Sequence, residues 1–155
     1  MTFAALVATF GGAGRLKPAP GTWGSAAALG LAVPLHLLGG QLALGVAAFV
    51  AFGAGLWGAG AYAKAQGAKD PSEVVIDEVA GLWLVFAFIP LTAVTALLGF
   101  ALFRLFDIAK PWPISLANTA VPGAFGIMLD DCLAGLAAAA VLWGAGRIFP
   151  IVLVS

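Results

Sequence analysis

The segment VVIDEVAGLWLVFAFIP, residues 74–90, decides how the rest of the chain is interpreted. Two adjacent carboxylates, Asp77 and Glu78, stand near the start of an apolar run that ends at a proline. The preceding DPSE, residues 70–73, has the pattern of an N-cap, a proline at the first helical position and a capping-box glutamate. The sequence therefore predicts a helix over residues 71–89, about 28 Å long, with both acids in its first two turns.

The whole chain shares the apolar character of this segment. Of its 155 residues, 63% are hydrophobic and 9% are charged, whereas soluble domains are about 45–50% apolar and about 25% charged. A soluble chain of this size cannot bury so much apolar surface, because too much of it still faces water. We therefore expect a single integral membrane domain spanning residues 1–155.

Four further apolar segments are predicted to be helices, and no segment alternates as a strand would. They cover residues 23–38, 41–63, 91–106 and 128–149. Residues 64–73 form a polar connection, and a loop is expected from residue 107 to about 126. Density of Ala, Leu and Gly is typical of membrane helices. The predicted fold class is all-α, a polytopic membrane bundle of about five short helices.

Counting the predicted crossings places the charges on one side of the membrane. All seven acids and six of the seven bases fall on that face, and Arg147 alone falls on the other. The positive-inside rule makes the charged face cytoplasmic. Because some predicted helices are shorter than a hydrocarbon core of about 30 Å, the acids are expected at headgroup depth, where ionisable residues are usually functional.

Several classes of function lack support in the sequence. No basic stripe with interleaved aromatics is present, so a nucleic-acid partner is not expected. A single cysteine, Cys132, excludes an intrachain disulfide and a cysteine zinc cluster, and a single histidine, His36, excludes a His-rich metal site. The first 14 residues have no basic region or cleavage pattern of a signal peptide.

A second pair of acids, Asp130 and Asp131, stands at the start of the last apolar segment. Helix N-termini favour negative charge, so simple capping is one interpretation of this pair. The other is a divalent cation, because two neighbouring carboxylates repel each other and hard cations such as Mg²⁺ prefer carboxylate oxygens.

A third cluster, Arg104, Asp107 and Lys110, shares a helix face at a spacing of three residues. A salt bridge within the cluster is the simpler interpretation. Since this cluster and both acid pairs are expected on one membrane face, we favour a metal site with basic residues that hold phosphate oxygens.

A stiff loop, RLKPAPGTWGS at residues 15–25, leads into the first long apolar segment. Its candidate phosphate-binding groups are Arg15, Lys17, Thr22 and Ser25, because a helix N-terminus binds phosphate through backbone N–H groups. The alternative interpretation is that the prolines and glycines of this segment simply form a loop and bind no ligand.

Four separated motifs give the chain a specific resemblance to a known family. They are APGTWGS at residues 19–25, VIDEVAG at 75–81, FRLFDIAKPWPI at 103–114 and GIMLDDCLAG at 126–135. In order and spacing these motifs resemble the bacterial phosphatidylglycerophosphatase A family, from about Gly14 to the C-terminus.

This resemblance implies a Mg²⁺-dependent inner-membrane enzyme that removes the terminal phosphate of phosphatidylglycerophosphate to give phosphatidylglycerol. Its phospholipid substrate would stay in the membrane, and the active face would be cytoplasmic. The family's site residues carry over onto Asp77, Glu78, Asp107, Asp130, Asp131, Arg104 and Lys110. Of these, the expected metal ligands are Asp77, Glu78, Asp130 and Asp131.

One departure from the family concerns residues 118–119. Many members carry an Asp-Arg pair there, and this chain has Asn118 and Thr119. If that arginine holds phosphate in other members, this chain must use Arg15, Lys17 or Lys110 instead.

Three questions stay open from the sequence. The nucleophile is either a water molecule on the metal, with Asp107 or Glu78 as base, or an aspartate that forms an acyl-phosphate. A non-enzymatic ion-coupled transporter is the main alternative function, and an alcohol phosphotransferase of phospholipid synthesis is another. The sequence does not give the oligomeric state.

Overall fold

The computed structural model describes residues 1–149, and all of the regular structure within them is helical. The elements are α1 (Phe3–Ala8), the 3₁₀ helix η1 (Phe10–Arg15), α2 (Pro20–Gln66), α3 (Ile76–Phe88), α4 (Ala93–Ala109), α5 (Ile114–Ala120) and α6 (Gly123–Ile148). The all-α prediction is confirmed. The count of about five helices is not, because α1, η1 and α5 were not predicted.

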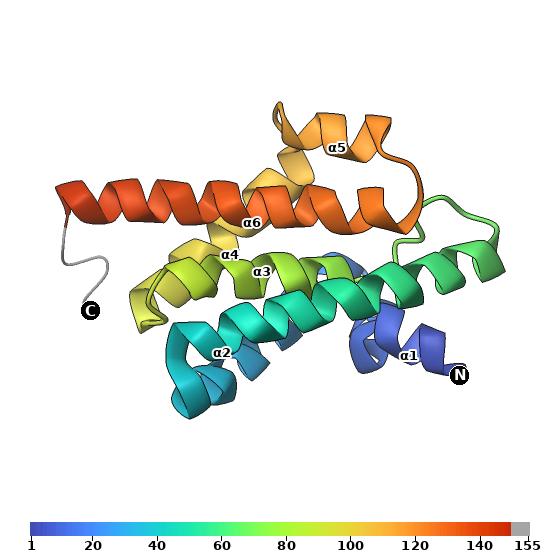
Figure 1. Cartoon of the computed structure of the whole chain (residues 1–155), viewed down its shortest axis with the longest axis horizontal. Helices are drawn as coiled ribbons and strands as arrows, with labels where there is room; N and C mark the ends of the chain where they lie inside the picture. The colour runs from blue at the N-terminus through green and yellow to red at the C-terminus, as the bar shows by residue number, and fades with distance from the viewer. Residues whose placement is uncertain (150–155) are drawn as a thin grey trace.

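Helix α2 consists of two arms that run in opposite directions. Its backbone leaves helical geometry at Gly39 and Gly40, where φ is −162° and 60°, and Figure 1 shows the chain turning back there. The arms, residues 20–38 and 41–66, correspond to the predicted helices 23–38 and 41–63.

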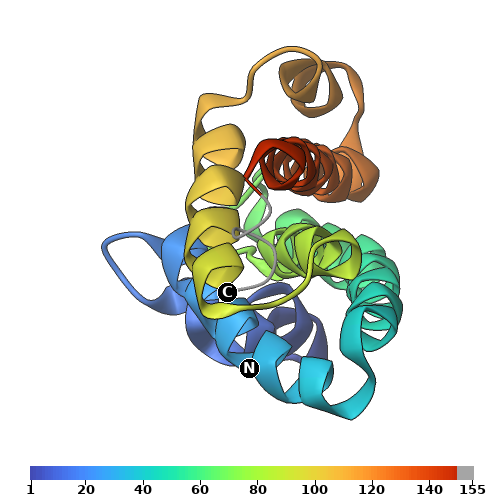
Figure 2. The same cartoon turned by 90° about the vertical axis from the view of Figure 1, so that its left-hand side faces the viewer.

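Helix α3 lies at the centre of the bundle. It packs against both α2 and α6, and the end view in Figure 2 shows α2, α4 and α6 around it. The indole Nε1 of Trp83 donates a hydrogen bond of 2.8 Å to the carbonyl oxygen of Ala28, which links α3 to the first arm of α2. Fully buried side chains fill the space between the helices, the largest being Phe86, Phe103, Leu44 and Leu82.

The predicted start of the third helix is wrong. Helix α3 begins at Ile76, not at residue 71, and no side chain caps it. The amide of Val75 donates to the carbonyl of Ala8 at 2.9 Å, which draws this backbone toward α1 instead of into a helix. Glu73, the predicted capping-box residue, instead accepts a hydrogen bond of 2.7 Å from the hydroxyl of Tyr62.

The predicted loop over residues 107–126 is also wrong. Helix α4 continues to Ala109, α5 occupies Ile114–Ala120, and α6 begins at Gly123. The Asp130–Asp131 pair therefore lies about two turns inside α6, and the first turn of that helix holds no acid. Capping of a helix N-terminus does not explain this pair.

Two helices, α2 and α6, are long and apolar enough to cross a membrane by length and composition. Large apolar side chains also cover the outside of the bundle: Leu37, Leu38 and Phe49 are 80%, 83% and 80% exposed. Many large exposed apolar side chains are typical of a surface that contacts a membrane or a protein. These features support membrane association.

Candidate metal and phosphate site

Two glycines bring α3 and α6 into backbone contact beside the acid pairs. A Cβ atom built on Gly135 lies 2.2 Å from the carbonyl oxygen of Gly81, and a Cβ on Gly81 lies 2.5 Å from that of Asp131. Neither position has room for a side chain. Gly81 follows Asp77 by one turn and Gly135 follows Asp131 by one turn, so this close crossing places the acids of α6 against those of α3.

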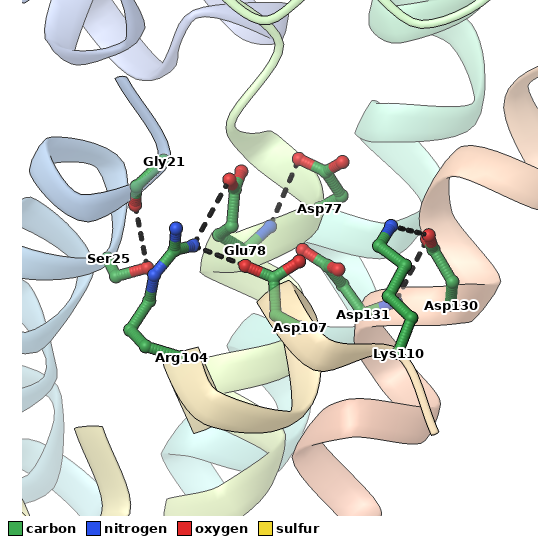
Figure 3. Close-up of polar contacts among 9 residues, drawn as sticks. All are labelled: Gly21, Ser25, Asp77, Glu78, Arg104, Asp107, Lys110, Asp130 and Asp131. Carbon is green, nitrogen blue, oxygen red and sulfur yellow. Dashed lines mark hydrogen bonds and ion pairs between the residues drawn. The ribbon is translucent and has the colours of Figure 1, made fainter. Parts of the chain in front are cut away.

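Three carboxylates meet at this crossing. One oxygen from each of Asp77, Glu78 and Asp131 lies within 4.8 Å of the others, and Figure 3 shows the three groups pointing to the same region. All three residues are buried. Glu78 Oε2 and Asp131 Oδ2 have no hydrogen-bond partner among the described residues. Buried, unpaired carboxylate oxygens in one place are the donor set that a hard divalent cation requires.

Arg104 joins this group to α4. Its Nη1 donates to Asp107 Oδ2 at 2.5 Å and to Glu78 Oε1 at 3.4 Å. The salt bridge between Arg104 and Asp107 that the spacing suggested is therefore present, but it is part of the larger cluster (Figure 3). Helix α2 closes the other side at Gly21, where an added Cβ would lie 2.2 Å from Glu78 Oε1 and 2.9 Å from Arg104 Nη1.

Lys110 pairs with Asp130 at the opposite side of the cluster. Its Nζ donates to Asp130 Oδ2, and its backbone has φ of 42°, a conformation uncommon for a residue with a side chain. Burial alone would lower the pKa of Lys110, but the hydrogen bond to Asp130 and the negative charges of Asp130, Asp131 and Asp107 raise it overall. The ammonium group therefore stays charged at neutral pH.

These groups line a pocket of about 360 Å³. Its charged lining residues are five carboxylates and two cations, Asp70, Asp77, Glu78, Asp107, Asp131, Arg104 and Lys110. Burial raises the pKa of Asp70 at the pocket rim, and Lys110 opposes that shift. Because negative groups outnumber positive ones, the pocket is suited to a divalent cation together with the phosphate that it neutralises.

The predicted phosphate-binding residues of the 15–25 loop lie elsewhere. Arg15, Lys17, Thr22 and Ser25 are not among the residues that line the pocket. Ser25 is buried, and its Oγ donates to the carbonyl oxygen of Gly21 at 2.8 Å. This segment instead contributes Ala19 and the first two residues of α2, Pro20 and Gly21, to the pocket wall.

Residues 118–119, where the chain departs from the family pattern, lie in α5. The hydroxyl of Thr119 donates to the carbonyl oxygen of Ser115 at 2.9 Å, on an exposed face. Thr119 is not among the residues that line the pocket.

Asp70 and Gly21 line the pocket but were not among the predicted site residues. Asp70 was expected only to cap a helix, and the polar stretch around it gave no sign that it would reach the acids of α3. Gly21 stands in the APGTWGS motif, but its function depends on contact with Glu78 and Arg104, which are distant in sequence.

Comparison with known proteins identifies the family of this chain. A family model described as phosphatidylglycerophosphatase A matches residues 6–145. This chain belongs to the phosphatidylglycerophosphatase A family. The predicted family is therefore confirmed. The matched range includes every residue that lines the pocket.

Among curated relatives, the phosphatidylglycerophosphatase A of Haemophilus influenzae is 41% identical over 144 residues, covering 89% of this chain and 85% of the relative. The Escherichia coli protein of the same name is 33% identical over 153 residues, covering 97% and 87%. A Bacteroides thetaiotaomicron protein named putative phosphatidylinositol-3-phosphatase is 38% identical over 143 residues, covering 84% and 86%. No solved structure matches the chain.

Proposed function

We propose that this protein is a membrane phosphatidylglycerophosphatase, which hydrolyses the terminal phosphate monoester of phosphatidylglycerophosphate to give phosphatidylglycerol. The observation that supports this most strongly is the meeting of Asp77, Glu78 and Asp131 within 4.8 Å in a pocket that also holds Arg104 and Lys110. Carboxylates for a cation, beside cations for phosphate oxygens, are the two requirements of phosphoryl transfer.

The three buried carboxylates would hold Mg²⁺, which supplies neutralisation and orientation of the phosphate oxygens. Asp130, also expected as a ligand, has a different role in this proposal, because it holds the ammonium of Lys110. Asp107 holds Arg104 in the same way. Arg104 and Lys110 then stabilise the charge that develops on the transferring phosphoryl group.

This arrangement is compatible with either candidate nucleophile, a water molecule or an aspartate. A water molecule would be activated by a carboxylate at the pocket wall, and an aspartate would attack phosphorus directly. Rapid-quench experiments with labelled substrate distinguish the two, because only the second route leaves a phosphoenzyme.

The chain would lie in the bacterial inner membrane as a multi-pass protein with the pocket at the cytoplasmic face. The loops next to the pocket carry Lys17 and Lys69, which agrees with the positive-inside rule. The transporter alternative is not favoured, because its acids should be reached from both sides of the membrane. Those of this chain gather at one end of α3 and α4 and about two turns into α6.

The headgroup is the part of the proposal that most needs a direct comparison, since the curated relatives carry two different substrate names. Phosphate release from phosphatidylglycerophosphate, phosphatidic acid and phosphatidylinositol 3-phosphate should be measured side by side in mixed micelles. We expect phosphatidylglycerophosphate to give the highest kcat/KM, and preference for either other lipid would reassign the substrate.

The metal site is tested with Asp77→Asn and Asp131→Asn. Each should lower phosphate release at least about 100-fold, because loss of even an indirect metal-site partner costs about 10–100-fold. Glu73→Gln is the matched control, since Glu73 lies in the loop before α3 but binds Tyr62 outside the pocket. Chelation with EDTA should abolish wild-type activity and added Mg²⁺ should restore it. Near-full activity of both asparagine variants would refute the assignment.

A further inference from the structure

An apolar groove of about 720 Å³ runs along the outside of the bundle between the first arm of α2 and α4. Its lining includes Ala26, Gly30 and Val33 from α2, and Ala96 and Phe100 from α4. These two helices lie next to each other on one side of the bundle (Figure 2). The volume lies within the range of about 300–1,000 Å³ that is typical of ligand pockets.

On α4 the groove and the charged pocket occupy one continuous face. Ala96 and Phe100 line the groove, and Arg104 and Asp107 line the pocket. Successive members of this series are three or four residues apart, which is the spacing of one helix face. The last groove residue on α4, Phe100, therefore stands one turn before Arg104.

The first arm of α2 shows the same continuity. Ala26, Gly30, Val33 and Leu37 line the groove at helical spacing. Gly21, little more than a turn before Ala26, lines the pocket and lies against Glu78 and Arg104. On both helices the residues that line the groove thus begin about one turn beyond those that line the pocket, so the apolar groove lies in line with the charged pocket.

The length of the groove suits a lipid chain. From Ala26 to Leu37 the helix rises about 17 Å at about 1.5 Å per residue, and one leaflet of a hydrocarbon core of about 30 Å is about 15 Å deep. A phospholipid with its phosphate in the charged pocket would therefore extend one acyl chain along the groove to about the bilayer midplane.

Resting on the proposed function, we propose that this groove binds one acyl chain of the phospholipid substrate while the terminal phosphate lies beside Arg104 and the carboxylates. The charged end alone selects a phosphate monoester. The groove adds selection for a membrane lipid over a water-soluble phosphate, because each buried methylene contributes transfer free energy.

Gly30 offers a way to fill the groove without disturbing the bundle. A Cβ at Gly30 meets nothing within 4 Å, so Gly30→Phe places a ring in the groove. Gly53→Phe is the matched control: Gly53 lies in the other arm of α2, also has nothing within 4 Å of an added Cβ, and lines none of the pockets described for this chain.

Activity should be measured on long-chain phosphatidylglycerophosphate in mixed micelles and on a short-chain, monomeric analogue. Gly30→Phe should lower kcat/KM for the long-chain lipid about tenfold, through loss of chain contacts, and leave the value for the short-chain analogue unchanged. Gly53→Phe should resemble wild type on both. Equal effects of the two variants, or an equal loss on both substrates, would overturn the proposal.

A second measurement does not depend on catalysis. Phosphatidylglycerophosphate with a photoactivatable diazirine in one acyl chain should label the Asp131→Asn protein at groove residues such as Leu29 and Phe100, and Gly30→Phe should abolish that labelling. Groove labelling without phosphate release by wild type would retain the groove and refute the proposed reaction. Labelling spread evenly over the apolar surface would overturn the proposal that the groove binds the chain. A second copy of the protein in the groove would also overturn it, and size exclusion would then show a smaller species for Gly30→Phe than for wild type.

Discussion

Helix α3 and the second arm of α2 are similarly apolar in sequence but have opposite surroundings. In α3, ten of 13 residues are buried, including the carboxylates of Asp77 and Glu78. The second arm of α2 instead exposes Leu42 and Phe49, at 78% and 80%. Two of the site's carboxylates thus belong to the helix that neighbouring helices cover most completely. In α3 a change that disturbs packing should also disturb the chemistry, whereas no residue of the second arm of α2 lines the charged pocket.

The largest effect is expected from a substitution that separates α3 from α6. Gly135→Val should destabilise the protein by at least about 3 kcal/mol, the upper end for overpacking, because its Cβ would lie 2.2 Å from the carbonyl oxygen of Gly81. Phosphate release should be lost with it. The thermal midpoint in detergent micelles and the rate of phosphate release measure both effects.

Gly144→Val is the control for that variant, since it makes the same exchange in α6 where an added Cβ meets nothing within 4 Å. It should change stability by about 0.5 kcal/mol or less. A similar loss in both variants would mean that the exchange itself, and not the crossing, is responsible.

Removing the Lys110 cation should have the next largest effect. Lys110→Met should lower kcat about 100-fold, as expected for a group that stabilises transition-state charge, while Lys110→Arg should retain a measurable part of the activity.

The pH dependence has a definite sign. Because the pKa of Lys110 is raised from its ordinary value, the cation is present below that pKa and is lost only as pH rises through it. Wild-type activity should therefore show no fall from Lys110 deprotonation up to about pH 10, near the ordinary lysine value. A pH–rate profile in which Lys110→Arg removes an alkaline fall below that pH would contradict the assignment.

A smaller effect is expected from a substitution at Gly21, where α2 lies against Glu78 and Arg104. Gly21→Ala inserts a methyl group 2.2 Å from Glu78 Oε1, so the carboxylate or Arg104 must move. We expect a roughly tenfold fall in kcat, since a displacement of about 1 Å costs up to about 100-fold, with little change in thermal midpoint. Gly53→Ala, in the same helix with open space around it, should keep wild-type activity.

The smallest effect is expected on the outer face. Phe49→Leu replaces one exposed apolar side chain by another on the second arm of α2. In lipid or detergent, activity and stability should stay within about 0.5 kcal/mol of wild type. A large loss, measured as a drop in the thermal midpoint, would show that this face is covered by protein.

The sequence was sufficient for the fold class and the family. The apolar composition, the Pro90 break and the two long arms of α2 all follow from local patterns. The starts of helices were harder to predict from the sequence. The DPSE motif at residues 70–73 has every local feature of a helix cap, but the amide of Val75 donates a hydrogen bond to the carbonyl oxygen of Ala8, and the helix begins only at Ile76. A contact between residues so far apart has no local signature.

The site shows the same division. Acid pairs and the Arg104–Asp107 spacing were visible along the chain, whereas the choice of partners was not. The axial register of α6 against α3 determines which carboxylates lie close together, and the Gly81–Gly135 contact sets that register. The same register leaves Asp130 with Lys110 and leaves the bases of the 15–25 loop outside the pocket.

The shortness of α3 has a consequence for the supply of water, the second reactant of any hydrolysis. Its 13 residues rise about 20 Å, and α6 beside it rises about 39 Å over 26 residues. In the proposed membrane arrangement, α3 is about 10 Å shorter than a hydrocarbon layer about 30 Å thick, whereas α6 is longer than that layer. Thinning of the bilayer over the end of α3 that carries Asp77 and Glu78 would bring solvent to the carboxylates, while the fatty acid chains of the substrate stay in the hydrocarbon layer.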